Sequence, residues 1–259
     1  INLITVGYST ANMKLSVNLN KIALLRNSRG GHQPDLEYFA KEALDEDIIG
    51  LTVHPRPDER HIKHSDLELI KNITDQYKKE FNIEGNPLEE GSQSYVGFME
   101  IIRKYKPTQT TLVPDSTSQI TSDHGWEMTE ANNLDLTKEV RQYSARCSIF
   151  VDADSDLNLL TNKDINAIEI YTGPYAQAVL ENNNKQTESE VEKIKNLSLK
   201  AKELGLRVNA GHDLNLENLP ELRKLDLIDE VSIGHAIITQ SLIYGFKETI
   251  KKYLEVTNG

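Results

Sequence analysis

Short apolar runs rich in β-branched residues alternate along this chain with segments whose apolar residues recur every three or four positions. The runs predict strands at 15–19, 51–54, 81–84, 110–113, 148–151, 167–170, 206–209 and 230–233. The periodic segments predict helices at 36–44, 65–77, 96–105, 134–143, 157–160, 188–204, 219–225 and 237–253. Such alternation is typical of βαβ units around a parallel sheet.

Eight strand–helix pairs are the number found in a (β/α)8 TIM barrel. We therefore expect an α/β fold of that class, with additional short helices, as a single domain over residues 13–259. Residues 1–12 precede the first expected strand and are expected to be an N-terminal leader or extension. The alternative is a doubly wound sheet, which usually has fewer strands and often a G-x-G-x-x-G fingerprint that this chain lacks.

Two local signals predict where helices begin and end. Ser65, with Glu68 three residues later, predicts a capping box at the start of the second helix. Gly205 predicts the end of the long helix over 188–204. The polar stretch that follows the first strand is expected to be a long loop.

Composition narrows the class of protein. The formal net charge of −11 disfavours a nucleic-acid partner, because a phosphate backbone selects a basic surface. No run approaches the ~20 apolar residues of a membrane span, and no apolar h-region opens the chain. The single cysteine, Cys147, excludes an internal disulfide and a multi-cysteine zinc site. We expect a soluble, cytoplasmic protein with neither a nucleic-acid nor a membrane partner.

Polar residues stand at or near the ends of most predicted strands. The carboxyl ends of barrel strands form one face, so these side chains are expected to converge there. They are Asn18, His54, Glu84, Asp152, Glu169, Asn209, His212 and the pair Gly234-His235. Each alone could equally cap its strand. Together, two histidines and several carboxylates favour an acid–base catalytic site that works near neutral pH.

Three segments have the chemistry of anion sites. The run 54–61 places Arg56, Arg60 and His61 after the second strand, although a solvated charge run paired with its own carboxylates is the alternative. The basic segment 26–31 follows the first strand, and its two glycines suggest a mobile loop. The segment 232–236 passes from strand to helix at a corner where barrel enzymes commonly bind phosphate. Together, these three segments suggest that the site binds two phosphates rather than one.

A metal site is not expected. His54, His61 and His64 are close in sequence, but they lie in a proline-containing loop. Such a loop does not present two ligands on one helix face as H-E-x-x-H does.

The chain resembles the pyridoxine 5′-phosphate synthase family over nearly its whole length, from about residue 15 to 253. The matching stretches are VNLNKIALLRNSRG (17–30), GLTVHPRPDERHI (50–62), NIEG (82–85), TLVPDSTSQITSDHGW (111–126), IEIYTGPYA (168–176), VNAGHDL (208–214) and IGHAII (233–238). The resemblance implies condensation of 1-deoxy-D-xylulose 5-phosphate with 3-amino-2-oxopropyl phosphate to pyridoxine 5′-phosphate, phosphate and water. It also implies a TIM barrel, assembly as a homo-octamer, and no metal or organic cofactor.

The resemblance also implies roles for individual residues. His54, Glu84 and His212 would be the acid–base residues, with Glu169 as a stabilising carboxylate. The amino-ketone would contact Asn18, Arg29, Gly234 and His235, and the sugar phosphate would contact Arg56, His61 and Thr121. Asn20, Lys21 and Asp213 complete the expected substrate-binding set. Glu84 would take the proton that forms an enamine, with His54 as a second base, and His212 would give a proton to the leaving phosphate.

Three positions depart from the family pattern. Asn20-Lys21 stands where Asp-His is common, Asp213 where a glycine is common, and Tyr171 where a histidine is common. A carboxylate near phosphate is repulsive, so Asp213 is expected to point away or to pair with Lys21. Two other functions stay open, namely another phosphosugar barrel enzyme, such as an aldolase or epimerase, and a non-catalytic binder of phosphorylated metabolites. A Schiff-base aldolase would need a lysine at a strand end, whereas Lys21 lies beyond the first strand.

Overall fold

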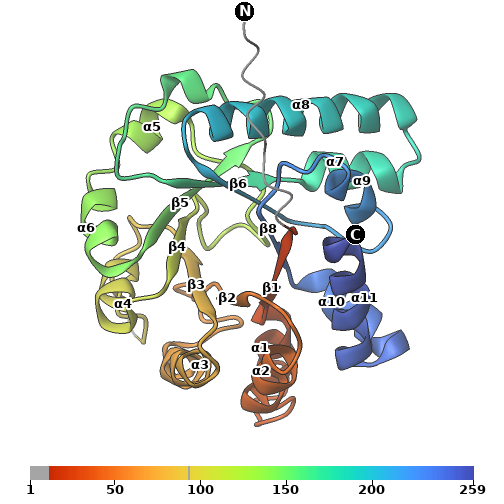
Figure 1. Ribbon diagram of the computed structural model, residues 1–259. Coiled ribbons are helices and arrows are strands. Elements are labelled where there is room, and N and C mark those ends of the chain that lie inside the picture. The colour runs from red at the N-terminus through yellow and green to blue at the C-terminus, as the bar shows by residue number, and fades with distance from the viewer. Residues whose placement is uncertain (1–11, 93) are drawn as a thin grey trace, which may run out of the picture.

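A computed structural model describes residues 12–92 and 94–259 (Figure 1). Eight parallel strands form a closed barrel in sequence order, and the last strand pairs with the first. Helices surround the barrel on its outside (Figure 1). The predicted TIM-barrel fold is thus confirmed. The leader or extension expected at 1–12 lies, apart from Asn12, outside the described residues.

Each strand of the barrel overlaps one predicted apolar run. The strands are β1 (Lys14–Asn18), β2 (Gly50–Val53), β3 (Glu80–Gly85), β4 (Gln109–Leu112), β5 (Arg146–Asp152), β6 (Ala167–Tyr171), β7 (Arg207–Gly211) and β8 (Glu230–Ile233). Strands that are buried on both faces need apolar residues toward the helices, and the β-branched runs provide them.

The helices depart from the prediction more than the strands do. They are α1 (Asn20–Asn27), α2 (Leu36–Leu44), α3 (His64–Tyr77), α4 (Phe98–Tyr105), α5 (Met128–Asn132), α6 (Leu136–Tyr143), the 3₁₀ helix η1 (Leu157–Leu159), α7 (Gly173–Leu180), α8 (Asn184–Glu203), α9 (Leu219–Arg223), α10 (His235–Tyr244) and α11 (Phe246–Asn258). The helix predicted over 237–253 is two helices, because Gly245 between them adopts φ +85°. The structure does contain the additional short helices that we expected.

Two predictions near α1 and α3 were wrong. The first half of the polar stretch after β1 is not a loop but α1, which buries Ile22 and Ala23. The capping box at Ser65 does not form, because α3 begins one residue earlier, at His64. Instead, the Asp66 carboxylate accepts a hydrogen bond from the Lys63 N–H at 2.8 Å and binds both terminal nitrogens of Arg26. This buried ion pair joins the end of α1 to the start of α3.

The barrel interior is unusually polar. A chain of side-chain hydrogen bonds of 2.8–3.4 Å crosses it from strand to strand. Its members, in order, are Ser16, Thr52, Asn82, Thr111, Gln109 and Asn209. Buried polar groups are stable when they form hydrogen bonds with one another. This row of hydrogen-bonded side chains supports the residues at the carboxyl ends of the strands.

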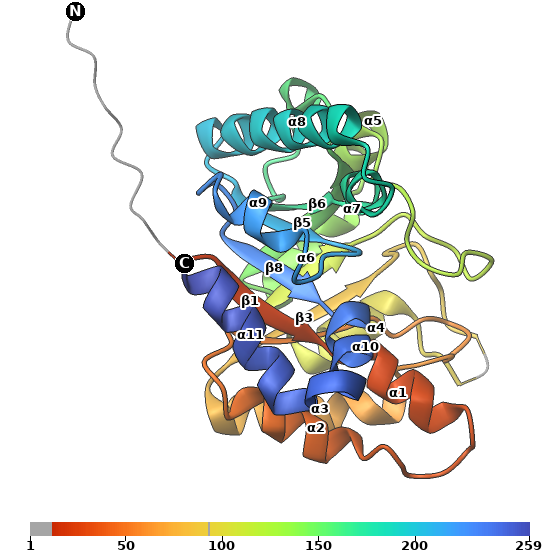
Figure 2. The ribbon, with the colours of Figure 1, turned by 90° about the vertical axis from the view of Figure 1, so that its right-hand side faces the viewer.

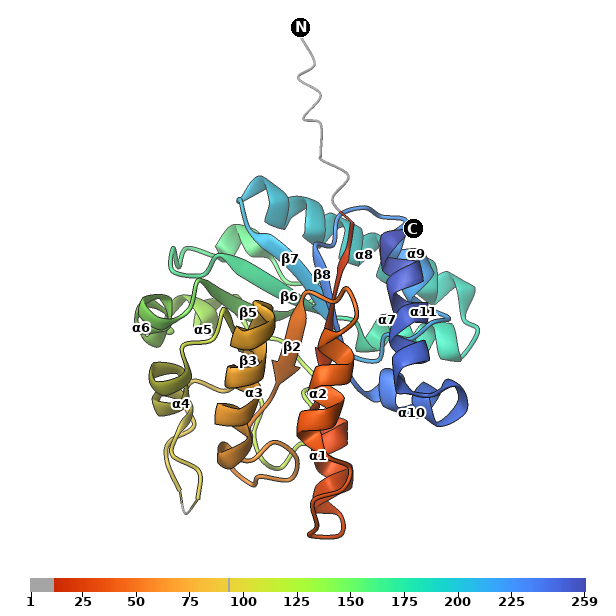
Figure 3. The same ribbon diagram turned by 60° about the horizontal axis from the view of Figure 1, so that its bottom comes forward.

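The last helices complete the wall of the barrel. α11 runs alongside β1 (Figure 2), and α10 packs beside α1 (Figure 3). Within the residues described, no helix combines the length and apolar character needed to cross a membrane.

Candidate active site

The expected acid–base residues meet at the carboxyl-terminal face of the barrel. His54 follows β2 directly, and its Nδ1 lies 3.9 Å from Oε2 of Glu84 on β3. The carboxyl group of Glu169 on β6 is close enough to Glu84 to raise its pKa. His212 directly follows β7, and its charge would lower the pKa of His54. Four residues from strands far apart in sequence thus share one site.

His54 is a buried imidazole between two carboxyl groups. Burial lowers its pKa to about 3, and the Arg56 guanidinium and His212 add to this effect. Its Nε2 lies 3.7 Å from Oδ2 of Asp115, on the side opposite Glu84. The backbone N–H of His54 donates to Oδ1 of Asn20 at 2.9 Å, which ties the end of β2 to α1. His54 is therefore a neutral base at neutral pH.

The pKa values of both glutamates are raised. Burial raises the pKa of Glu84 well above its usual 4.5, and the neighbouring Glu169, Asp115 and Glu230 carboxyls raise it further. Burial, reinforced by Glu230, raises the pKa of Glu169 to about 8. The Glu169 Oε2 atom has no hydrogen-bond partner among residues 12–92 and 94–259. A Cβ at Gly211 would stand 2.4 Å from the other Glu169 oxygen, so a larger residue there would displace the Glu169 carboxyl group.

The raised pKa of Glu169 predicts a pH dependence of stability. The unfolded chain releases this proton near pH 4.5 and the folded chain near pH 8, so the free energy of unfolding falls as pH rises between these values. Glu169→Gln keeps the side chain neutral and should make this fall shallower. Urea unfolding at about pH 5 and about pH 9 measures it. Glu217→Gln, at an exposed position, is the control, and equal slopes in wild type and Glu169→Gln would contradict the prediction.

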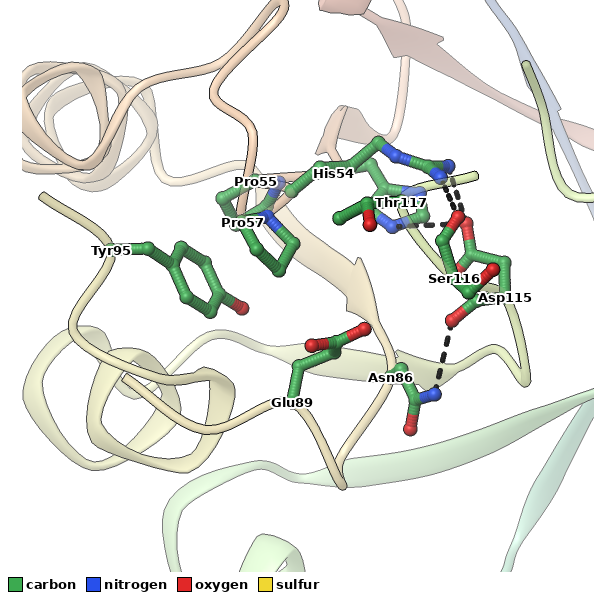
Figure 4. A pocket seen from close by; sticks show the side chains of 10 residues that line it. His54, Pro55, Pro57, Asn86, Glu89, Tyr95, Asp115, Ser116 and Thr117 are labelled. Atoms are coloured by element: carbon green, nitrogen blue, oxygen red, sulfur yellow. Dashed lines mark hydrogen bonds and ion pairs between the residues drawn. The ribbon is translucent and has the colours of Figure 1, made fainter. Parts of the chain in front are cut away.

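Asp115 is a site residue that the sequence analysis missed. Its buried carboxylate accepts from Arg56 Nη1 and, at 3.1 Å, from the Ser122 hydroxyl. Figure 4 shows Asp115 facing His54 across the pocket, with Asn86 donating to the Asp115 backbone carbonyl at 3.0 Å. The sequence feature that could have revealed it is a carboxylate shortly after β4. This is the one strand for which no polar end residue was considered.

Arg56 and Arg60 fasten the loop after β4 to the loop after β2. Arg56 Nη2 donates to the backbone carbonyls of Ser116 and, at 3.1 Å, Gln119. Arg60 donates to the carbonyls of Gln119 at 3.0 Å and Thr117 at 2.7 Å, and it also forms an ion pair with Asp58. Arg60 thus pairs with a carboxylate of its own segment, as the alternative interpretation of residues 54–61 predicted. Arg56 instead points into the site.

His61 lies beside His54. The ring centroids are 6.1 Å apart, and burial together with the His54 and Arg56 charges lowers the pKa of His61 to about 3. Its Nδ1 accepts the Ile62 N–H at 2.9 Å, so Nε2 is the nitrogen that carries a hydrogen when the ring is neutral.

His212 is held in a constrained backbone conformation. Its φ is +79°, and that of Asp213 is +55°. The Thr172 hydroxyl lies 2.5 Å from the His212 carbonyl oxygen and 2.6 Å from that of Gly211. The imidazole packs against Phe150 and Tyr171, with centroids 5.0 and 5.5 Å away. Burial lowers the pKa of His212, although the Asp213 and Asp115 carboxylates oppose the shift.

Several expected binding residues lie at the rim. Arg29, Thr121, Asp213 and His235 are exposed, whereas Asn18, Asn20, Lys21 and Gly234 are partly buried. Among the described residues no ion pair joins Asp213 to Lys21, so the second alternative for Asp213, pairing, is not formed. The expectation of a mobile loop over 26–31 was wrong for its first two residues. Arg26 and Asn27 form the last turn of α1 and bind Asp66 and the His61 carbonyl.

The corner between β8 and α10 has the geometry of an anion site. Gly234 precedes the first turn of α10, whose N–H groups face outward at the helix start. A Cβ at Gly234 would stand 3.0 Å from the Asn18 Cβ, so glycine lets β1 and this turn approach closely. Among residues 12–92 and 94–259, no group of three or more His, Cys, Asp or Glu side chains is arranged to hold a metal ion.

Comparison with known proteins gives a consistent picture. A family model described as pyridoxal phosphate biosynthesis protein PdxJ matches residues 15–259. Pyridoxine 5′-phosphate synthase from Xanthomonas oryzae pv. oryzae is 39% identical over 251 residues, covering 95% of this chain and 97% of the relative. The enzyme of the same name from Xylella fastidiosa is 42% identical over 247 residues, covering 94% of each.

Solved structures resemble this chain in fold alone. Thiamine phosphate pyrophosphorylase from Pyrococcus furiosus aligns with a TM-score of 0.58 at 13% identity, covering 96% of this chain and 99% of that one. The tryptophan synthase A-subunit from the same organism aligns with a TM-score of 0.57 at 12% identity, covering 95% and 98%.

Proposed function

The chain belongs to the PdxJ family of pyridoxal phosphate biosynthesis proteins, and we propose that it is the enzyme that makes pyridoxine 5′-phosphate. Its substrates would be 1-deoxy-D-xylulose 5-phosphate and 3-amino-2-oxopropyl phosphate, which condense with loss of phosphate and water. The observation that carries the proposal is the pair formed by His54 and Glu84. A neutral imidazole and a carboxyl group with a raised pKa lie 3.9 Å apart, which places a proton acceptor beside a proton donor.

Proton transfer to and from carbon would fall to this pair. Attack of the amine on the ketone and loss of water give an imine, and removal of a neighbouring C–H proton gives an enamine. Glu84 can remove that proton only after giving up its own, and Nδ1 of His54, 3.9 Å from Oε2 of Glu84, is in position to accept it. Because the pKa of His54 is about 3 in the free protein, His54 would hold this proton only once the bound phosphates raise that pKa, and Glu84 would then serve as the base.

Departure of the sugar phosphate would use Arg56, His61 and His212. The Arg56 Nε is buried without a hydrogen-bond partner in the part of the chain described, so it retains one donor for an anion. His212 is neutral in the free protein, but two bound phosphates would raise its pKa and let it donate a proton. Glu169, neutral up to about pH 8, would donate a hydrogen bond to an oxygen that gains charge.

The second phosphate, which the product retains, would occupy the corner between β8 and α10. The backbone N–H groups at Gly234 and His235 and the Asn18 side chain support this placement. Arg29 and Thr121 stand at the rim, where they would reach substrate only after their loops close.

Product formation tests the function directly. Purified protein supplied with both substrates should release pyridoxine 5′-phosphate and inorganic phosphate in equal amounts, and omission of either substrate should abolish both. Tight binding of both substrates without product would show a metabolite binder instead. Covalent trapping of a ketose phosphate by borohydride on a lysine would indicate an aldolase.

We also propose that copies of this chain associate, as the family's octamers do, through a patch formed by Leu25, Leu242, Ile243 and Tyr244. These residues of α1 and α10 are 48%, 84%, 75% and 49% exposed. Adjacent large apolar side chains at such exposure are typical of protein–protein contacts. Double substitution Leu242→Glu/Ile243→Glu should lower the mass measured by light scattering, whereas Leu180→Glu on α7 should not. An unchanged mass for the double variant would refute this role of the patch.

A further inference from the structure

His54 stands between two carboxyl groups that reach it from opposite sides. Glu84 Oε2 lies 3.9 Å from Nδ1, and Asp115 Oδ2 lies 3.7 Å from Nε2. Glu84 comes from β3, whereas Asp115 comes from the loop that follows β4. The other charged or titratable neighbours that influence the ring are Arg56, Arg60, Asp58, His61 and His212. Two acids facing the two nitrogens of one ring raise the question of which nitrogen carries the hydrogen.

Asp115 is fixed as a charged acceptor. The Arg56 guanidinium and the Asp115 carboxylate are 2.5 Å apart and at most 5% exposed, so each is the counter-ion of the other. The Ser122 hydroxyl donates to the same oxygen at 3.1 Å. Burial raises the pKa of Asp115, but Arg56 and Ser122 oppose the shift by stabilising the charged form. This acid is thus an oriented carboxylate, unlike Glu84, which pairs with no arginine or lysine in the described part of the chain.

We propose that Asp115 is a positioning residue that holds the hydrogen of His54 on Nε2 and leaves the Nδ1 lone pair facing Glu84. A neutral imidazole has one donor and one acceptor nitrogen, and the N–H is favoured on the side of the carboxylate. The inference rests on the proposed function, because it assigns the orientation of that reaction's proton acceptor. Asp115 itself would not exchange protons with the substrate.

This orientation gives each proton a defined path. Once the bound phosphates have raised the pKa of His54, the Glu84 O–H proton passes to Nδ1 of His54, which leaves Glu84 as a carboxylate that takes the C–H proton of the imine. The resulting imidazolium donates from Nε2 to Asp115, so its charge is paired while it lasts. The imidazolium later returns its proton to Glu84 or to a leaving oxygen. With the hydrogen on Nδ1 instead, Glu84 would face a donor and could not release its proton to this ring.

The distances from His54 to Glu84 and to Asp115 indicate when this proton transfer takes place. Both exceed a hydrogen bond by about 1 Å, and such contacts commonly tighten only when substrate closes the site.

The tautomer of His54 can be measured without substrate. Nitrogen-15 NMR of histidine-labelled protein, with His54→Gln to identify the signal, should show the Nε2–H form in wild type. Asp115→Asn removes the charge and should shift the ring toward a mixture of tautomers or toward Nδ1–H. The Nδ1–H form in wild type, or an unchanged tautomer in Asp115→Asn, would overturn the proposal. This measurement decides the tautomer even if no pyridoxine 5′-phosphate is formed.

Kinetics test the consequence for turnover. Asp115→Asn should lower kcat by about 10²-fold with little change in KM, and Asp115→Glu should restore part of the loss. Asp123→Asn is the matched control, because Asp123 is an exposed carboxylate in the same loop that pairs with His124 at 2.7 Å. A threefold or smaller effect of Asp115→Asn would contradict the proposal. The proposal would also be contradicted if Asp115→Glu had as low a kcat as Asp115→Asn although both variants unfold at the same urea concentration as wild type.

Discussion

Glu84→Gln is expected to lower kcat for pyridoxine 5′-phosphate formation by about 10²–10⁴-fold, the usual contribution of a general acid–base group. Glutamine preserves the size of the side chain and its neutral form, but it cannot release a proton to His54 or accept one from carbon. Because Glu84 is neutral in the free protein, the substitution should leave KM and folding stability nearly unchanged. The loss should therefore appear in kcat alone.

Steady-state kinetics with both phosphorylated substrates measure this effect. Glu90→Gln is the matched control, since it changes an exposed glutamate in the loop that follows the same strand. If Glu84→Gln retained more than a tenth of wild-type kcat, another group would have to be the base. A parallel rise in KM would instead assign Glu84 to substrate binding.

Arg56→Met is expected to destabilise the fold by about 3–5 kcal/mol at neutral pH, the cost typical of leaving a buried charge without its partner. The two side chains are 4% and 5% exposed, so water cannot replace the lost guanidinium around Asp115. The substitution also releases the carbonyls of Ser116 and Gln119. Without the guanidinium the pKa of Asp115 rises further, so the folded variant takes up a proton as pH falls. The difference in stability from wild type should therefore shrink toward acid pH.

Urea unfolding at about pH 7 and about pH 5 measures this pH dependence. The double variant Arg56→Met/Asp115→Asn should recover part of the stability, because the stranded charge is gone. Arg60→Met is the matched control: Arg60 pairs with Asp58 in the same loop, but both are about a third exposed, so the loss should stay near 1 kcal/mol or less. A loss of equal size at both pH values would show that packing, not charge, is responsible.

The strands were predictable because their sequence pattern and their burial have the same cause. Each is covered by helices on its outer face, so each carries a run of β-branched and apolar residues. α1 was missed because only Ile22 and Ala23 of its eight residues are buried, which leaves little periodicity to detect. α7 was missed because it opens with Gly173-Pro174, a pair that suggests a turn although proline is favoured in a first helical turn.

The site was predictable where a residue directly ends a strand. His54 and Glu84 follow from the rule that barrel strands present their ends to one face. Asp115 was missed because two further residues separate it from the end of β4. Its partner Arg56 is 59 positions away, and the partner of Arg26 is 40 positions away. Nothing in local spacing reports such pairs, since the folded barrel alone brings their loops together.

The pairing of β1 with β8 has a consequence for biosynthesis. Lys14 stands opposite Glu230 in the register, so the ring cannot close until the ribosome has released the chain past β8. Until then the nascent sheet has two unsatisfied parallel edges, which are templates for association with other chains. The barrel therefore cannot be completed before β8 is synthesised, and protection of those edges during translation is a requirement that the order of the strands creates.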